Sequence, residues 1–154
     1  MMKEVTGKLN STGMKFALVT ARFNSFFTEQ LLDGAKDCFL RHGGSEKDLT
    51  LVRVPGSNDI PLVAAKLAEG RKYDAVIALG VVIQGSTAHA DLIENSISRA
   101  LSELALTSKT PVINAVVATQ NLEQAIERAG SKMGNRGWDG VQAAIELVSV
   151  LKQL

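Results

Sequence analysis

The apolar run Ala75–Leu79 constrains the fold of this chain more than any other segment. It lacks the alternation of polar and apolar residues that marks a half-solvated strand, and it is short enough for a single strand. Such runs are typical of central parallel strands that helices cover on both faces. We therefore expect a parallel sheet with this strand in its interior.

The residues after this run carry the clearest indication of chemistry. We expect the chain to turn at Gly80 and Gly85 and to begin a helix near His89. Ser86 and Thr87 supply two hydroxyls between them. Small residues, free backbone N–H groups and a helix N-terminus together form an anion site, and a histidine beside it favours phosphate chemistry with proton transfer. The alternative is a turn whose small residues only cap the helix.

Strand and helix patterns alternate along the whole chain. The patterns predict strands at 15–20, 49–54, 75–79 and 112–117, and helices at about 27–42, 60–72, 89–106, 121–129 and 138–151. Asn121 and Gln124 fit a capping pair for the fourth helix. This order predicts a three-layer α/β/α fold, with a parallel sheet, helices on both faces and right-handed crossovers. Without an internal repeat or a domain boundary, residues 1–154 are expected to form a single domain.

Composition excludes several classes of protein. A net charge of +1 gives no reason to expect a nucleic acid or an anionic membrane as a partner. No segment approaches the ~18 to 20 apolar residues of a membrane span, and residues 1–8 have no apolar signal region. Cys38 is the one cysteine, so an intrachain disulfide is impossible and a reducing compartment is expected. We expect a soluble cytoplasmic protein.

Ligands of such sheets bind beyond the carboxyl ends of the strands, near the point where the strand order reverses. Four segments are expected there, namely 21–24, 55–59, 80–89 and 114–119. Phe23 either stacks on a ligand or packs on its own helix, and Asp59 either binds a ligand or caps the next helix. Arg128, Lys132 and Arg136 either bind an anion or form a solvated basic face.

Four motifs in this order resemble the 6,7-dimethyl-8-ribityllumazine synthase family of riboflavin biosynthesis. They are Ala21-Arg-Phe-Asn24, Val54-Pro-Gly-Ser57 with Ile60-Pro61, Gly80 to His89, and Leu122 to Gly137. The block Glu-Gln-Ala-Ile-Glu-Arg-Ala-Gly at 123–130 is the most specific of them. The resemblance covers essentially the whole chain, and it implies a flavodoxin-like version of the expected fold.

The resemblance implies a condensation that needs neither a metal nor an organic cofactor. The family joins 5-amino-6-(D-ribitylamino)uracil to 3,4-dihydroxy-2-butanone 4-phosphate, with release of inorganic phosphate and water. Carried over by position, His89 is the acid and base, and Arg128, Ser86 and Thr87 bind the phosphate, with Arg136 as a further candidate. The residues implied to bind the pyrimidine and ribityl groups are Phe23, Ser57, Asn58, Asp59, Val81, Val82, Ile83 and Asn114.

The chain departs from the family pattern mostly on the pyrimidine side. The family usually has an aromatic residue at the position of Asn58, Glu at that of Asp59 and Phe at that of Asn114. It usually has a basic residue at the position of Gln84, an aromatic at that of Ala90 and Lys at that of Arg136. Two apolar walls of the pyrimidine site are thus replaced by small polar groups, and the absence of each aromatic ring should weaken binding by roughly 1 to 3 kcal/mol.

Three functional hypotheses remain open from the sequence. The first is a working lumazine synthase. The second is a shell-forming assembly protein on this scaffold, natural or engineered, with weak or absent catalysis. The third is a relative with a changed substrate, such as an archaeal-type riboflavin synthase, which the block at 123–130 argues against.

The resemblance also implies self-association. Pentamers are expected, with Phe23, Asn58, Asp59 and His89 of one chain facing Asn114 and Arg128 of the next. Residues 3–8 can form a strand that joins a neighbour's sheet, and the apolar surface of the helix at 89–106 exceeds what one sheet face needs. The joint at 130–137 carries no insertion, which favours a 60-subunit icosahedral shell. Riboflavin synthase is a further candidate partner.

Overall fold

The computed structural model of the chain describes residues 1–84, 89–130 and 134–154, and of His89 it describes the backbone only. Its sheet contains the strands β1 (Phe16–Ala21), β2 (Leu49–Val54), β3 (Ala75–Ile83) and β4 (Val112–Thr119). They pair in parallel in the order β2-β1-β3-β4. The strand order reverses between β1 and β3, which is where a doubly wound sheet binds its ligand.

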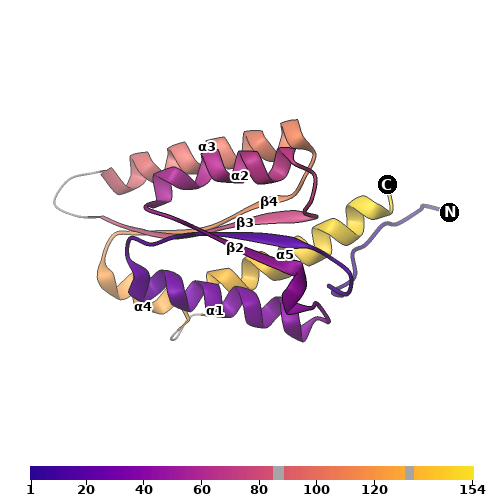
Figure 1. Cartoon of the computed structure of the whole chain (residues 1–154), viewed down its shortest axis with the longest axis horizontal. Coiled ribbons are helices and arrows are strands. Elements are labelled where there is room, and N and C mark those ends of the chain that lie inside the picture. The colour runs from indigo at the N-terminus through magenta and orange to yellow at the C-terminus, as the bar shows by residue number, and fades with distance from the viewer. Residues whose placement is uncertain (85–88, 131–133) are drawn as a thin grey trace.

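Helices cover both faces of this sheet. On one face lie α1 (Ser25–Arg41), α4 (Leu122–Arg128) and α5 (Arg136–Lys152), and on the other lie α2 (Ile60–Glu69) and α3 (His89–Ser108) (Figure 1). Each face buries its own apolar core, one built around Phe16, Leu31 and Ile145, and the other around Val19, Ile60 and Leu101. The predicted three-layer fold is confirmed.

Strand β3 is longer than the sequence predicts. The chain does not turn at Gly80 but continues as a strand to Ile83, which pairs with Thr119 of β4. The glycine instead allows the Ser57 side chain to lie close to the backbone of β3, because a Cβ atom at position 80 would lie 2.5 Å from the Oγ of Ser57. Since β1 pairs with β3 only as far as Leu79, the end of β3 extends beyond its neighbour.

Local hydrogen bonds set the helix ends. Helix α2 ends at Glu69 rather than at residue 72, because Gly70 follows and Arg71 adopts a left-handed φ of 56°. Helix α5 begins at Arg136, two residues earlier than predicted, because the Oδ1 of Asn135 accepts hydrogen bonds from the first N–H groups of the helix.

The predicted capping pair at the start of α4 forms with one shift in register. The Oδ1 of Asn121 accepts from the backbone N–H of Gln124 at 2.9 Å. The Gln124 side chain accepts in turn from the N–H of Gln120, one residue before the position that a capping box requires.

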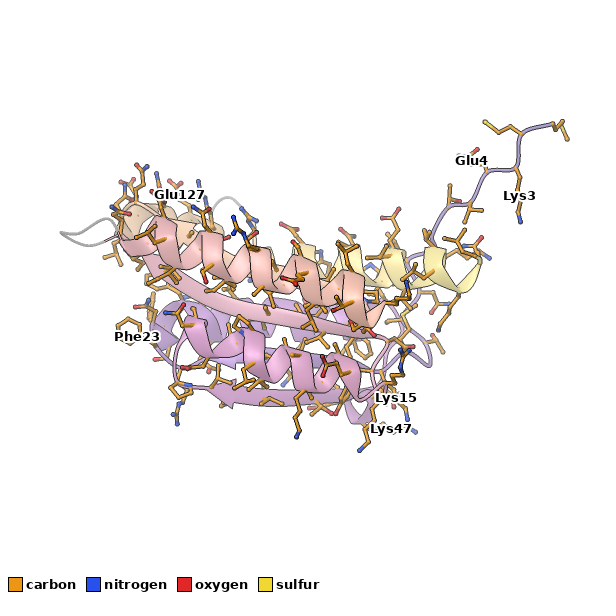
Figure 2. The ribbon with its side chains drawn as sticks, turned by 90° about the horizontal axis from the view of Figure 1, so that it is seen from above. Lys3, Glu4, Lys15, Phe23, Lys47 and Glu127 are labelled. Carbon is orange, nitrogen blue, oxygen red and sulfur yellow. The ribbon has the colours of Figure 1, made fainter. Side chains whose placement is uncertain are left out.

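The N-terminal residues lie beside the last helix of the same chain. Residues 1–15 contain no strand, and Lys8 donates its N–H to the Oγ of Ser149, while the Thr6 carbonyl accepts from Gln153. Lys3 and Glu4 project beyond the body of the molecule (Figure 2). The addition of this segment to a neighbour's sheet stays a prediction.

Helix α3 leaves less apolar surface uncovered by its own chain than the sequence predicts. Ile97, Leu101 and Leu104 are buried in the chain's own core, whereas Leu92 and Leu106 remain 67% and 78% exposed. No helix within the described ranges is both long enough and apolar enough to cross a membrane.

Candidate active site

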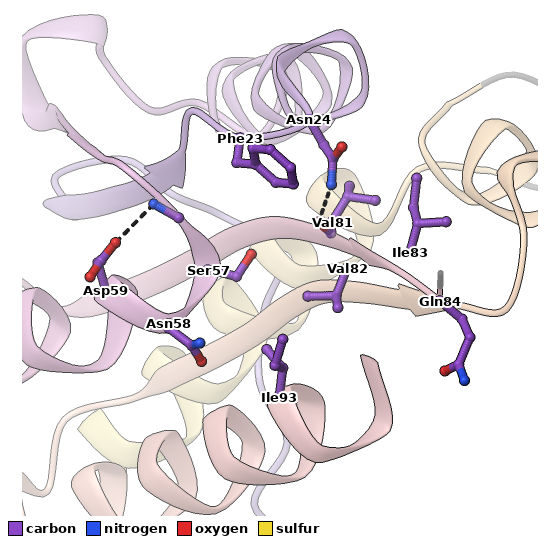
Figure 3. A pocket seen from close by; sticks show the side chains of 11 residues that line it. Phe23, Asn24, Ser57, Asn58, Asp59, Val81, Val82, Ile83, Gln84 and Ile93 are labelled. Carbon is purple, nitrogen blue, oxygen red and sulfur yellow. Dashed lines mark hydrogen bonds between the residues drawn. The ribbon is translucent and has the colours of Figure 1, made fainter. Parts of the chain in front are cut away.

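A pocket of about 580 Å³ opens beyond the carboxyl ends of β1, β2 and β3, a size typical of small-molecule sites (Figure 3). Its lining comprises Phe23, Asn24, Gly56, Ser57, Asn58, Asp59, Val81, Val82, Ile83, Gln84 and Ile93. Seven of the eight residues predicted for the pyrimidine and ribityl groups are therefore neighbours in the structure. Their roles as ligand contacts stay predictions.

The turn after β1 exposes an aromatic ring on a tethered backbone. The N–H groups of Arg22 and Phe23 donate to Val54 and Pro55, which fixes the turn against the end of β2. The Phe23 side chain is nevertheless 71% exposed, so it does not pack on its own helix as the alternative interpretation required. In Figure 2 it projects at one end of the sheet, opposite the end that carries Lys15 and Lys47. The ring is free to stack on a flat ligand.

Asn24 organises this corner of the pocket, although the sequence analysis assigned it no role. Its φ of 64° lies in the left-handed region, which asparagine tolerates better than most residues, and its carbonyl accepts the first N–H groups of α1. Its Nδ2 donates to the Val81 carbonyl at 2.8 Å (Figure 3). An asparagine between the first strand and the helix that follows it was the available signal for this role.

The turn after β2 presents a carboxylate at the rim. Residues Ser57–Asp59 form a single 3-10 turn in which the Oδ2 of Asp59 accepts from the Gly56 N–H at 2.9 Å. The Asp59 side chain makes no capping bond to α2, so the helix-cap alternative is wrong. The carboxylate is exposed beside the pocket and has free lone pairs for ligand hydroxyls.

The end of β3 supplies backbone groups to the same pocket. Successive residues of a strand point their N–H and C=O groups to opposite neighbours. The Val81 carbonyl faces Asn24, whereas the Gln84 N–H bonds to Thr119 on the β4 side. By this alternation, the backbone N–H and C=O groups of Ile83 point to the same side as those of Val81, which is the side away from β4. Backbone donors and acceptors thus line the pocket where β3 extends past β1.

Most of the predicted phosphate site falls outside the described residues. Gly85, Ser86, Thr87 and the His89 side chain belong to this part, and His89 is described only as the first residue of α3. The described lining of the pocket contains no cationic residue.

The remaining predicted residues do not line this pocket. Arg128 is half-buried on α4 and donates from Nη1 to the Ala118 carbonyl at 3.3 Å, and Arg136 is exposed at the start of α5. Asn114 lies in the middle of β4, opposite Ala78, and hydrogen-bonds to Glu94 and Val116. A single chain therefore does not bring these three residues to this pocket.

Other reactive groups lie apart from the pocket. Burial raises the pKa of the Cys38 thiol to about 12, assisted by the charges of Asp37 and Asp139. The thiol is therefore protonated at neutral pH and is not a nucleophile. Within the part of the chain that the structure describes, no three His, Cys, Asp or Glu side chains are grouped to hold a metal ion.

Known proteins match this chain over nearly its whole length. The sequence model of a family described as 6,7-dimethyl-8-ribityllumazine synthase matches residues 13–152. Two curated relatives, the 6,7-dimethyl-8-ribityllumazine synthases of two strains of Clostridium kluyveri, are each 49% identical over 153 residues. These alignments cover 99% of this chain and 99% of each relative.

Proposed function

The chain belongs to the 6,7-dimethyl-8-ribityllumazine synthase family, and we propose that it condenses 5-amino-6-(D-ribitylamino)uracil with 3,4-dihydroxy-2-butanone 4-phosphate. The observation that carries this proposal is the pocket at the strand-order reversal, lined by an exposed aromatic ring, strand-edge backbone groups and a carboxylate. These are the groups that a flat heterocycle with a polyhydroxyl chain requires.

The proposed reaction consists of steps that bound reactants can complete with one acid and base. The amine adds to the ketone and the resulting imine forms with loss of water. Phosphate is then eliminated, and closure of the ring releases water again. We assign the proton transfers to His89, because an imidazole titrates near neutral pH and can both give and take a proton. Orientation of two reactants supplies much of the remaining rate.

The two substrates occupy different parts of the proposed site. The pyrimidinedione stacks on Phe23, and its polar edge bonds to the backbone of Val81 and Ile83, with Val82 between them as a further lining residue. The ribityl hydroxyls bond to Ser57 and Asp59. The phosphate binds to the turn at Ser86 and Thr87 and to the guanidinium of Arg128. One N–H group of this guanidinium donates to the Ala118 carbonyl, and its remaining N–H groups can make charge-assisted hydrogen bonds to the phosphate.

The proposed site requires two copies of the chain. Asn114 and Arg128 do not line the pocket of their own chain, so they serve a ligand only if they face the pocket of a neighbour. We infer a pentamer in which each site lies between adjacent chains. The exposed Leu92 and Leu106 on α3 support a helix that packs against another copy.

Two finer inferences accompany the pentamer. The absence of an insertion at residues 130–137 supports further assembly into an icosahedral shell, in which riboflavin synthase is a candidate partner. A lone buried cysteine fits a cytoplasmic protein.

A direct assay tests the proposed reaction. Purified protein is mixed with both substrates, and formation of the lumazine is followed by its absorbance. We expect turnover well above the spontaneous rate, with release of an equal amount of inorganic phosphate. A rate equal to that of the mixture without protein would leave only the assembly role.

A further inference from the structure

Helix α3 contains a carboxylate that the proposed reaction does not use. Glu94 is half-buried, and its Oε1 accepts a hydrogen bond from the Nδ2 of Asn114 at 3.3 Å. Its other oxygen, Oε2, is buried without a hydrogen-bond partner among the described residues. A polar atom withdrawn from water in this way costs stability. The position of Glu94 is therefore not explained by folding alone.

Opposing influences act on the Glu94 carboxyl, and their net effect is a raised pKa. Burial raises this pKa most, and the hydrogen bond from Asn114 and the positive charge of Arg136 offset part of the rise. The interaction with Asn114 favours the ionised carboxylate, which is the stronger acceptor.

Asn114 is held at both ends of its amide. Its Oδ1 accepts from the Val116 N–H at 3.0 Å, and its Nδ2 donates to Glu94. The partners fix which end is which, because a backbone N–H can only donate. The amide therefore has a single orientation. It retains one N–H and one oxygen lone pair for a ligand, a donor and acceptor that match the N–H and C=O groups on the edge of a pyrimidinedione.

We propose that Glu94 is a positioning residue for substrate specificity, which locks Asn114 so that β4 offers a hydrogen-bonding wall to the pyrimidine in the neighbouring chain's pocket. The inference rests on the proposed function, since it takes the ligand and the shared site from there. It explains the polar residue at position 114 as one half of a pair. An aromatic residue there would leave both oxygens of this half-buried carboxylate without a donor among the described residues.

The test compares KM for the two substrates in wild-type protein and in Glu94 variants. Glu94→Leu removes the acceptor and frees the Asn114 amide. We expect KM for the ribitylaminouracil to rise by about 2- to 10-fold, the loss of one net hydrogen bond, with KM for the butanone phosphate unchanged. Glu94→Gln keeps an acceptor oxygen and should restore KM to within about twofold of wild type. Glu94→Ser, too short to reach Asn114, replaces the leucine variant if that protein does not fold.

A double variant tests whether Glu94 acts through Asn114. Asn114→Leu should raise the same KM, and Asn114→Leu/Glu94→Leu should raise it no further. Unchanged KM in Glu94→Leu, or an equal rise for both substrates, would overturn the inference while the activity of the wild-type protein still supports the proposed function. A wild-type protein that forms no lumazine would overturn both.

Discussion

Different residues are proposed to bind the two ends of the ligands, namely the pyrimidine with its ribityl chain and the phosphate. The turn that carries Phe23 is tied to the end of β2 by its backbone, whereas the Asn24 and Asp59 side chains themselves bond to the Val81 carbonyl and to the Gly56 N–H. We assign His89 and Arg128 to the phosphate end of the proposed site. His89 begins α3, and Arg128, which would come from the neighbouring chain, is anchored to the Ala118 carbonyl. The two ends are therefore separable by substitution.

Replacement of His89 by alanine tests the proton-transfer role. We expect the condensation rate to fall by ~10- to 100-fold, because general acid and base catalysis is lost while orientation of the reactants remains. The other histidine of the chain, His42, is the matched control. It bonds through Nδ1 to the Cys38 carbonyl at the end of α1, so His42→Ala should retain the wild-type rate. A full rate in His89→Ala would remove the assignment.

Replacement of Arg128 by alanine tests the phosphate contact. Removal of a charge-assisted hydrogen bond costs ~1.5 to 3 kcal/mol, so KM for the butanone phosphate should rise by ~10- to 100-fold. KM for the ribitylaminouracil should hardly change. Arg41→Ala, at an exposed arginine paired with Asp37, serves as the control for the removal of a positive charge. If both variants bind inorganic phosphate as wild type does, Arg128 has only its structural contact to the Ala118 carbonyl.

At the scale of the elements, one asparagine joins two helices. Asn135 accepts from the N–H groups of Gly137 and Trp138 at the start of α5, and its Nδ2 donates to the Gln30 carbonyl of α1 at 2.9 Å. Gly137 permits this junction, because a Cβ atom there would overlap the Leu31 carbonyl. The cap thus holds the start of α5 against α1.

Asn135→Ala should lower the free energy of unfolding by ~1 to 2 kcal/mol, because both the helix cap and the hydrogen bond to the Gln30 carbonyl are removed. Asn121→Ala, which removes one cap bond of the short helix α4, should cost less. Denaturant or thermal unfolding of the two variants measures the difference. Equal destabilisation would show that the hydrogen bond to α1 adds nothing.

The sequence predicted the ends of strands correctly where the residues that follow a strand cannot continue it. The bounds of β2 are as predicted, because Pro55 and Gly56 follow it directly. The end of β3 was missed, because Gly80 reads locally as a turn while its actual role depends on Ser57, which is distant in sequence. Glu94 belongs to no motif, and its proposed role follows only from its hydrogen bond to Asn114 on β4, the strand against which α3 packs.

At the scale of the whole molecule, the proposed site is divided between two copies of the chain. The pocket residues lie at the ends of β1, β2 and β3, whereas Asn114 and Arg128 lie on β4 and α4. Light scattering of the purified protein should give the mass of a pentamer or of a shell built from pentamers. Stable monomers with full activity would contradict the shared site, whereas isolated pentamers would remove only the shell.

Complementation between variants tests most directly the claim that this chain forms the lumazine at a site shared by two copies. His89→Ala and Arg128→Ala are co-expressed in equal amounts, and lumazine formation is measured at limiting butanone phosphate. A site between chains then receives both wild-type residues in about a quarter of the interfaces, so activity should approach about a quarter of wild type. Activity no higher than the average of the two single variants would contradict the account.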